Sequence, residues 1–520
     1  MRGFLRGTLV IYGALVAGGC ARLPQTPARN PILRDSTDYT SDPAPLVVDG
    51  TLYLLTGRDV ARVGQNDFVM PEWQMLATRA DPMRGPWSHT PHFVRPEDVF
   101  RWAMPGRAYA AQIVRGVDGR FYMYAPVVQA TTSDRDRFAI GVAVSASPTG
   151  PWTDAHPSGP IVSQSYPVAN TIQNIDPTVL VDDDRRVFLY WGTFGKLKGV
   201  ELERDMLTFK GAPVDVTSLD GFFEAPWLFN RNGTYYLAYA ANKAGPDSEC
   251  TEAVYYACLA YGTASSPLGP WTYRGVFLDP VSSTTSHPGI AEFNGAWYLA
   301  YHTADAIGGG HFRRSVAIDR LEWDDAATPA RIKKVIPTGG PVFDATPISN
   351  IASHARVTAS NAPVPVQYWL RALNDGKVRP SPLPPDMWAT WTPKNPPQQW
   401  VMYQWAEPVT IHASRIYFWG DQPPGAAIGV TAPRAWRLEY FEGGAWRSVS
   451  ATAQYTTNLH AFNRVEFAPV KTRCLRAVFD ASTDGKTYAA VAAQEWEVHA
   501  TVKRVPARLS PKGAANAACR

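Results

Sequence analysis

Five short turns, each followed by a β-branched or aromatic run, recur along the first two thirds of this chain. Each turn starts at Asp or Asn, in four cases directly before Gly; the five are Asp49, Asp118, Asp184, Asn232 and Asn294. Such turns between apolar runs are typical of β-hairpins. Their spacings are 69, 66, 48 and 62 residues. Repeats of this size, with several strands each, predict an all-β chain whose residues 30–345 form a five-bladed β-propeller.

A second repeat supports the same architecture. Gly-Pro-Trp occurs at residues 85–87, 150–152 and 269–271, each time after a short strand and a step into proline. This position fits the turn between the outer strands of a blade. We expect these tryptophans to pack between blades rather than to bind a ligand.

Seven or eight residues before each turn lies the residue that should begin the innermost strand of its blade. These residues are Asp42, Ala110, Asp176, Glu224 and His287. Innermost strands line the channel of a propeller and begin at the same mouth, so equivalent positions should converge there. An Asp-Pro step alone can be a turn that begins a strand. Three carboxylates and a histidine at equivalent positions favour a functional site, because carboxylates are rarely buried without a partner or a role.

The number and kind of these groups suit glycoside hydrolysis. That reaction needs one carboxylic acid to protonate the leaving oxygen and one carboxylate to activate water or to attack directly. A third acidic group can raise the pKa of the acid by like-charge repulsion. The longer side chain of Glu224 suits the proton donor, Asp42 the base across the channel, and Asp176 the pKa modulator. This chemistry requires no cofactor.

Residues 30–340 resemble glycoside hydrolase family 43, a family of inverting enzymes with a five-bladed propeller. The matching segments are Asn30-Pro31-Ile32-Leu33, Ser41-Asp42-Pro43, Ile175-Asp176-Pro177-Thr178-Val179, Phe223-Glu224-Ala225-Pro226-Trp227, Ser286-His287 and Trp297-Tyr298-Leu299-Ala300-Tyr301-His302. The resemblance implies that Asp42 is the general base, Asp176 the pKa modulator and Glu224 the general acid.

The resemblance also implies roles for two later residues. His287 would lie at the channel centre, near the substrate, and in some relatives this histidine binds Ca²⁺ directly or through water. Arg314 resembles an arginine near the sugar subsite. The chain departs from the family pattern at Tyr109-Ala110-Ala111, where Trp-Ala-Pro is common, and at Ala225 and Pro288.

From Ile351 onward the repeat stops, and the segment 346–500 has alternating strands with no helical period. This pattern predicts a β-sandwich. The opening Asn350-Ile351-Ala352-Ser353, the Asn374-Asp375-Gly376 triplet and the Trp-rich loops resemble a discoidin-like (coagulation factor type C) domain of galactose-binding jelly-roll type. Such domains often bind glycans, and some hold Ca²⁺. A purely structural sandwich is the alternative, and the basic tail 501–520 is expected to be disordered.

The N-terminus reads as an export signal. Residues 1–20 contain Arg2 and Arg6, a short apolar stretch and then Cys20 after small residues, which resembles a bacterial lipoprotein cleavage site. We therefore expect an exported periplasmic or outer-membrane lipoprotein, acylated at Cys20; ordinary secretion is the alternative. The lipid would be its only membrane contact. Cys250 and Cys258 are close enough in sequence to form a disulfide in an oxidising compartment.

Composition limits the class of partner. The net charge is +4 with 18% charged residues, so nothing indicates a nucleic-acid partner. Aromatic residues make up 12% of the chain, which suits either sugar stacking or ordinary β cores.

The predicted function is inverting hydrolysis of arabinose- or xylose-containing plant cell-wall polysaccharides or oligosaccharides. The alternatives are a galactan-directed exo-hydrolase of the same family, a retaining fructosidase-type enzyme, and a non-catalytic glycan-binding lipoprotein. The Ser41-Asp42-Pro43-Ala44-Pro45 segment argues against the retaining enzyme, whose equivalent resembles Asn-Asp-Pro-Asn-Gly.

Overall fold

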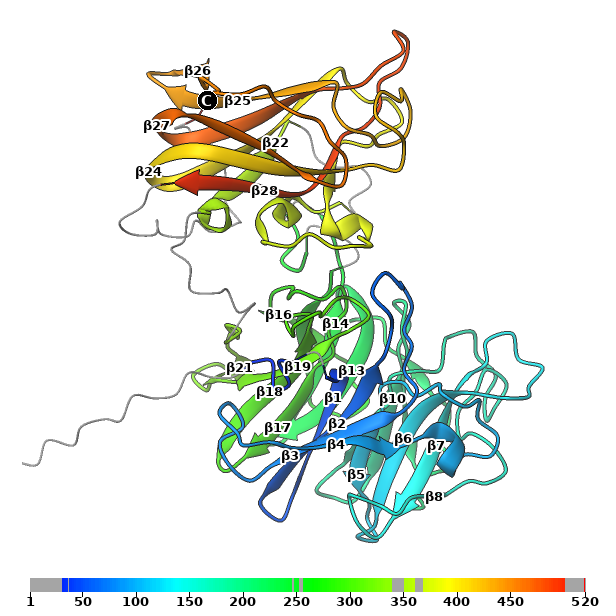
Figure 1. The fold of residues 1–520 in the computed structure, drawn as a ribbon. Coiled ribbons are helices and arrows are strands. Elements are labelled where there is room, and N and C mark those ends of the chain that lie inside the picture. The colour runs from blue at the N-terminus through cyan, green and yellow to red at the C-terminus, as the bar shows by residue number, and fades with distance from the viewer. Residues whose placement is uncertain are drawn as a thin grey trace, which may run out of the picture.

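The computed structural model describes residues 30–35, 37–245, 247–251, 256–338, 350–360, 368–500 and 519. These residues form two β-rich parts, a ring of sheets and, above it, a separate antiparallel sheet (Figure 1). The predicted all-β chain with a five-bladed propeller followed by a second β domain is confirmed. The expected signal segment, Cys20 and nearly all of the tail 501–520 lie outside the described residues.

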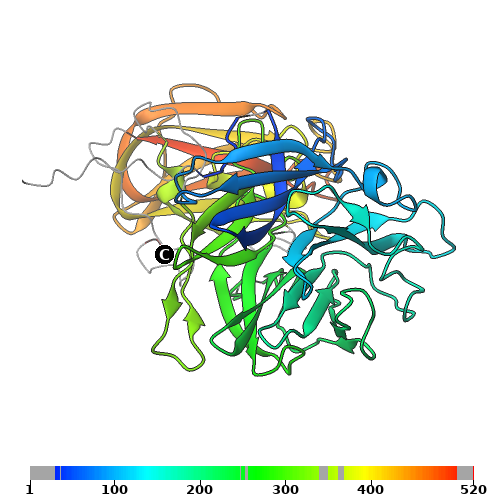
Figure 2. The ribbon, with the colours of Figure 1, turned by 90° about the horizontal axis from the view of Figure 1, so that it is seen from below.

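Five sheets make up the ring, and Figure 2 shows them following one another in chain order around it. Blade one contains β1 (Tyr39–Val48), β2 (Thr51–Asp59), β3 (Trp73–Thr78) and β4 (Ser88–Val94). Blade two contains β5 (Gln112–Arg115), β6 (Phe121–Val128), β7 (Phe138–Ser145) and β8 (Thr153–Asp154). Blade three contains β9 (Thr178–Val181), β10 (Val187–Trp191), β11 (Lys198–Leu202) and β12 (Val214–Asp215). Blade four contains β13 (Phe222–Arg231), β14 (Thr234–Ala241), β15 (Cys258–Ala264) and β16 (Thr272–Leu278). Blade five contains β17 (Gly289–Phe293), β18 (Ala296–Thr303) and β19 (Ser315–Arg320). A short helix α1 (Pro96–Val99) follows blade one, and a hairpin of β20 (Trp323–Asp324) and β21 (Arg331–Ile332) follows blade five.

The repeated turns connect the first two strands of each blade, as the sequence predicts. In three of them both central residues have positive φ; at Asn232 and Gly233, for example, φ is 53° and 77°. Positive φ at both positions is what a two-residue turn needs to match the twist of its strands. The Asn-Gly and Asp-Gly pairs thus fix these hairpins locally.

The segment before β1 closes the ring. Ile32 N–H donates to the carbonyl of Val316 at 2.8 Å, and Thr40 N–H donates to the carbonyl of Arg314 at 3.0 Å. The side chain of Asn30 bonds the backbone of Ile318 in both directions. The first described residues therefore run beside β19 and take the place of a fourth strand in blade five.

The Gly-Pro-Trp tryptophans pack between blades, as predicted. Trp271 of blade four donates its indole N–H to the hydroxyl of Tyr190 in blade three at 3.1 Å. Trp87 of blade one packs on the cluster that includes Phe293 and Tyr298 of blade five.

The second part is one antiparallel sheet of seven strands around its own apolar core. The strands are β22 (Arg356–Ala359), β23 (Trp388–Ala389), β24 (Gln398–Trp419), β25 (Ala435–Glu442), β26 (Ala445–Ser448), β27 (Phe462–Asp480) and β28 (Ala492–Ala500). Short 3₁₀ helices η1 (Ala352–His354), η2 (Leu370–Asn374) and η3 (Pro384–Asp386) lie before the long strands. The sequence suggested two separate strands near Arg464–Phe467 and Thr472–Phe479. The structure joins them in β27, because pairing with β24 continues across irregular positions.

Two disulfides are formed, Cys250–Cys258 and Cys474–Cys519. The first is the pair that the sequence brings close together. Within the described ranges, no helix has the length and apolar character needed to span a membrane.

Candidate active site

The residues predicted to begin the inner strands do converge at one mouth of the ring. Asp42 lies in β1 and Glu224 in β13, each beside a register shift of its strand. Asp176 and His287 lie two residues before β9 and β17. The equivalent residue of blade two, Ala110, is buried and apolar and contributes no functional group.

The backbone at this mouth is strained at corresponding places in three blades. Asp42, Asp176 and Ala225 have φ values of 50°, 55° and 58°, in the left-handed region that side chains other than glycine rarely adopt. Such strain persists only where surrounding contacts impose it, and it clusters at functional sites. The three positions therefore share one backbone conformation at corresponding places in three blades.

Asp42 is an ionised carboxylate. Burial alone would raise its pKa, but the Arg314 guanidinium, 2.8 Å away, holds the pKa of Asp42 well below its usual range. The Nδ1 atoms of His302 and His287 lie 3.3 and 3.8 Å from Asp42 Oδ1.

Glu224 has the opposite environment. Burial, followed by the negative charge of Asp42, raises the pKa of Glu224 to about 7, although the Thr193 hydroxyl and Arg314 act against this shift. Thr193 Oγ1 donates to Glu224 Oε2 at 3.2 Å. Glu224 therefore carries a proton at weakly acidic pH while Asp42 does not.

Asp176 lies beside the Glu224 segment, and its Oδ2 accepts the backbone N–H of Ala225 at 3.1 Å. Burial and the nearby carboxylates of Glu224 and Asp42 raise the pKa of Asp176 well above its ordinary value. The cluster thus combines one firmly ionised carboxylate with two that compete for protons.

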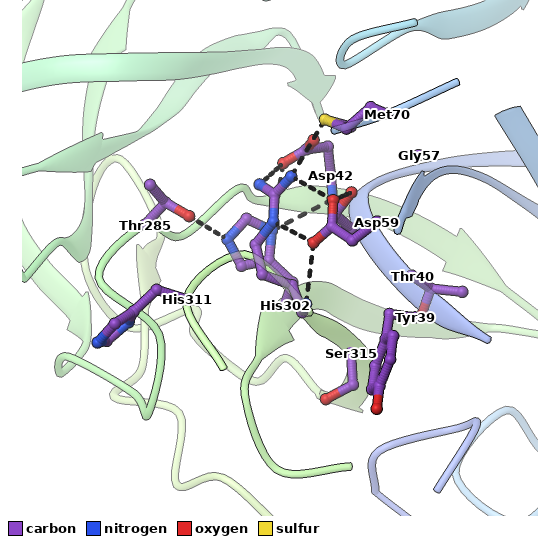
Figure 3. Close-up of polar contacts among 12 residues, drawn as sticks. Tyr39, Thr40, Asp42, Gly57, Asp59, Met70, Thr285, His302, His311 and Ser315 are labelled. Atoms are coloured by element: carbon purple, nitrogen blue, oxygen red, sulfur yellow. Dashed lines mark hydrogen bonds and ion pairs between the residues drawn. The ribbon is translucent and has the colours of Figure 1, made fainter. Parts of the chain in front are cut away.

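Arg314 is held between two carboxylates, Asp42 and Asp59. Its Nε lies 2.8 Å from Asp59 Oδ2, and its guanidinium stands 4.8 Å from the ring centroid of Phe68. Figure 3 shows Asp42 and Asp59 on the same side of this network, with His302 below them. The sequence predicted Arg314 at the site but missed Asp59. Since β1 and β2 are antiparallel, the end of β2 lies beside the start of β1, and this rule could have identified Asp59.

His287 is buried beside Asp42, and burial lowers its pKa to about 4 despite the opposing charge of Asp42. Its imidazole is therefore neutral at physiological pH. His302, which the sequence analysis quoted but gave no role, contacts Asp42 more closely than His287 does.

The side chains at this mouth do not fit a calcium ion held directly by His287. Calcium takes about six to eight oxygen ligands, whereas the nearest carboxylate, Asp42, is paired with Arg314. Among the described residues, no group of three or more His, Cys, Asp or Glu is placed to hold a metal ion. Calcium in this channel stays a prediction, and no step of the chemistry depends on it.

Comparison with known proteins identifies relatives of the propeller. The sequence model of glycosyl hydrolases family 43 matches residues 28–329. A xylosidase/arabinosidase of Bacteroides ovatus is 31% identical over 334 residues, which cover 55% of this chain and 93% of that protein. A beta-xylosidase of Xylanibacter ruminicola is 28% identical over 331 residues, covering 55% of this chain and 95% of that protein. A solved GH43 beta-xylosidase/alpha-arabinofuranosidase from a compost microbial metagenome is 27% identical, with a TM-score of 0.49 and coverage of 60% of this chain and 97% of that structure.

Proposed function

The chain belongs to glycosyl hydrolases family 43, and we propose that it cleaves xylose- or arabinose-containing oligosaccharides of xylan and arabinoxylan with inversion at the anomeric carbon. The observation that carries the proposal is the contrast between Asp42, which is ionised, and Glu224, which holds its proton up to about pH 7. One base and one acid at a common mouth are what single displacement needs.

In the proposed reaction, Asp42 takes a proton from a water molecule, whose oxygen attacks the anomeric carbon. The bond from that carbon to the leaving oxygen breaks, and Glu224 gives its proton to the departing oxygen. Asp176 supports this step by holding the backbone at Ala225, and its carboxyl group shares with Glu224 a pKa raised above the ordinary value. The configuration inverts, and we expect the two catalytic carboxyl groups to lie about 6.5–9.5 Å apart.

Arg314 and His287 complete the proposed site. Arg314 keeps Asp42 ionised and fixes its orientation. The neutral imidazole of His287 offers the sugar a hydrogen-bonding group without adding charge.

The test compares two leaving groups. Glu224→Gln should lower kcat/KM on xylobiose by about 10³-fold or more but much less on nitrophenyl xyloside, because nitrophenolate leaves without a proton. Asp184→Asn, in the exposed turn at the other end of blade three, is the matched control and should behave as wild type. Equal losses on both substrates would remove Glu224 from the acid role.

A panel of nitrophenyl glycosides separates the alternatives. Activity on the galactoside alone would favour a galactan-directed exo-hydrolase, and no activity on any would favour a glycan-binding protein. Proton NMR of the first anomer released decides between inversion and the retaining mechanism.

For the second β domain we propose a discoidin-like module that binds glycan. The support is a cavity of about 590 Å³ in its loops, lined by Trp391, Lys394, Ile428 and Tyr488, with Trp391 40% exposed. An exposed indole beside polar side chains suits the apolar face of a sugar ring. Trp391→Ala should abolish retardation of the protein in arabinoxylan-containing native gels; unchanged retardation would favour a purely structural domain.

We also propose a Ca²⁺ in this domain, beside two acidic side chains. Asp375 and Glu495 are buried carboxylates, and Glu495 Oε1 has no hydrogen-bond partner among the described residues. Bound calcium would hold both carboxyl groups in their ionised forms and stabilise the fold. Chelator should then lower the melting temperature of wild type but not of Glu495→Gln.

Cellular location remains a proposal based on the sequence of residues 1–20. Labelling with radioactive palmitate should be lost in Cys20→Ser. Labelling of neither protein would favour secretion without an anchor.

A further inference from the structure

The loop between β16 and β17 carries His287 and Thr285, and the second β domain holds this loop from outside. Arg379 of that domain donates from Nη2 to the carbonyl of Ser282 at 3.0 Å. A second contact reaches the loop through His311 of the propeller, whose side chain Figure 3 shows on the same side of the polar network as Thr285. The two contacted residues, Ser282 and Thr284, lie five and three positions before His287.

Asp386 of η3 is the anchor on the domain side. Its side chain is 1% exposed, and it accepts hydrogen bonds from His311 Nε2 at 2.6 Å and from the hydroxyl of Tyr256 at 3.2 Å. It also pairs with Arg379 at 2.7 Å. A carboxylate so buried and so fully bonded fixes the position of the His311 imidazole.

Both ring nitrogens of His311 are used. Since Nε2 donates to Asp386, Nδ1 is free to accept the backbone N–H of Thr284, at 3.1 Å. One neutral tautomer satisfies both bonds. The imidazole therefore links the second domain to the backbone of the loop.

The next residue of the loop continues toward the active site. Thr285 Oγ1 lies 2.8 Å from His302 Nε2, and His302 Nδ1 accepts the backbone N–H of Asp42 at 3.2 Å. Because Nδ1 is an acceptor, the proton of the neutral ring is on Nε2, and the Thr285 hydroxyl accepts it. Thr285 thus holds the ring in the orientation in which Nδ1 faces the Asp42 N–H.

Asp42 depends on that acceptor. Its φ of 50° lies in the left-handed region, which aspartate adopts less readily than glycine, and the contacts around it stabilise this conformation. His302 Nδ1 is the partner of the Asp42 N–H in this conformation. A displaced imidazole would release the backbone from which the carboxylate projects.

We propose that Asp386 and His311 are positioning residues for the catalytic base, so that the second β domain forms part of the catalytic unit. The connection runs from Asp386 through His311 to the loop, and from Thr285 through His302 to Asp42. The inference rests on the proposed function, in which Asp42 is the base.

Two substitutions of His311 separate the two links, tested in the full chain on xylobiose. His311→Gln can still donate to Asp386 but no longer accepts the Thr284 N–H, whereas His311→Asn keeps the acceptor for Thr284 and loses Asp386. Each should lower kcat about tenfold and leave KM within about twofold, because the base is misplaced while the sugar still binds.

The inner link has its own pair of variants. Thr285→Val removes the hydroxyl and should lower kcat about tenfold, and Thr285→Ser should restore it to within about twofold. The matched control is Lys377→Ala, which breaks the ion pair with Asp305, 3.2 Å long, at the same domain junction and leaves the hydrogen bonds of His311 and Thr285 in place. Its kcat should stay within about twofold of wild type.

Two results would overturn the proposal: wild-type kcat in both His311→Gln and Thr285→Val, or an equal loss in Lys377→Ala. Should a His311 variant not fold, Asp386→Asn replaces it, because it keeps the side-chain volume; unchanged kcat in that variant also refutes the link. Wild-type activity in Asp42→Asn would instead refute the proposed base, so the two failures are distinguishable.

Discussion

Thr193 offers a direct test of how the protein sets the pKa of Glu224. Its hydroxyl donates to Glu224 Oε2 at 3.2 Å and lowers the pKa that burial and Asp42 raise to about 7. Thr193→Val removes this donor while keeping the shape of the side chain. The ionised form of Glu224 then loses a stabilising bond, so its pKa must rise.

The size of the rise follows from the strength of the bond. A hydrogen bond contributes about 0.5–1.5 kcal/mol net, and 3.2 Å is long for a hydroxyl donor. At about 1.36 kcal/mol per pH unit, the pKa of Glu224 should increase by about 0.4–1.1. The alkaline limb of kcat/KM should therefore move from about pH 7 to between about pH 7.4 and 8.1.

The assay is kcat/KM on xylobiose across pH, since a sugar leaving group needs the proton that Glu224 supplies. Thr193→Ser keeps the hydroxyl and should retain the wild-type limb. A limb that stays in place or moves to lower pH in Thr193→Val would refute both the donor role of Thr193 and Glu224 as the group that titrates.

Three further predictions concern charge and covalent links. Glu224 has a pKa of about 7 in the folded chain against an ordinary value of 4.5. The folded state is therefore fully stable with respect to this group below pH 4.5, and stability is lost as pH rises through 7 because the buried side chain ionises. Glu224→Gln should raise the free energy of urea unfolding at pH 8 by up to about 3 kcal/mol and leave it unchanged at pH 4. Arg314→Met should move the acidic limb of kcat/KM to higher pH, because Arg314 lowers the pKa of Asp42, and should lower the unfolding free energy by about 3–5 kcal/mol; an unmoved limb would contradict this. Replacing Cys250 and Cys258 together by Ser opens a loop with a sequence separation of 8 and should cost about 2–3 kcal/mol in urea unfolding without reductant. A double variant as stable as wild type would show that the bridge does not form.

Much of the propeller is predictable because its signals are local. An Asn-Gly pair such as Asn232-Gly233 adopts positive φ at low cost wherever it occurs, so it specifies a hairpin without help from distant residues. Once five hairpins are recognised, the position of Asp42 or Glu224 follows from counting along each strand. The fold and the convergence of the carboxylates are thus contained in short stretches of sequence.

The second β domain shows where that reasoning stops. The sequence separates the strands near Arg464 and Thr472, whereas β27 runs through both. The pairing with β24 that holds β27 together involves residues 45 to 82 positions apart, from Tyr417↔Phe462 to Gln398↔Asp480, for which no local pattern exists.

The sequence by itself determined the five hairpins and the residues that begin their inner strands, since both depend on turn chemistry and on the two-residue period of a strand. Only the tertiary structure decided what those residues can do. The proton on Glu224 and the charge on Asp42 depend on burial and on Arg314, which is 272 residues from Asp42. The contact of His311 with Asp386 depends on how two domains meet, because electrostatic and hydrogen-bonding partners act through distance in space rather than along the chain.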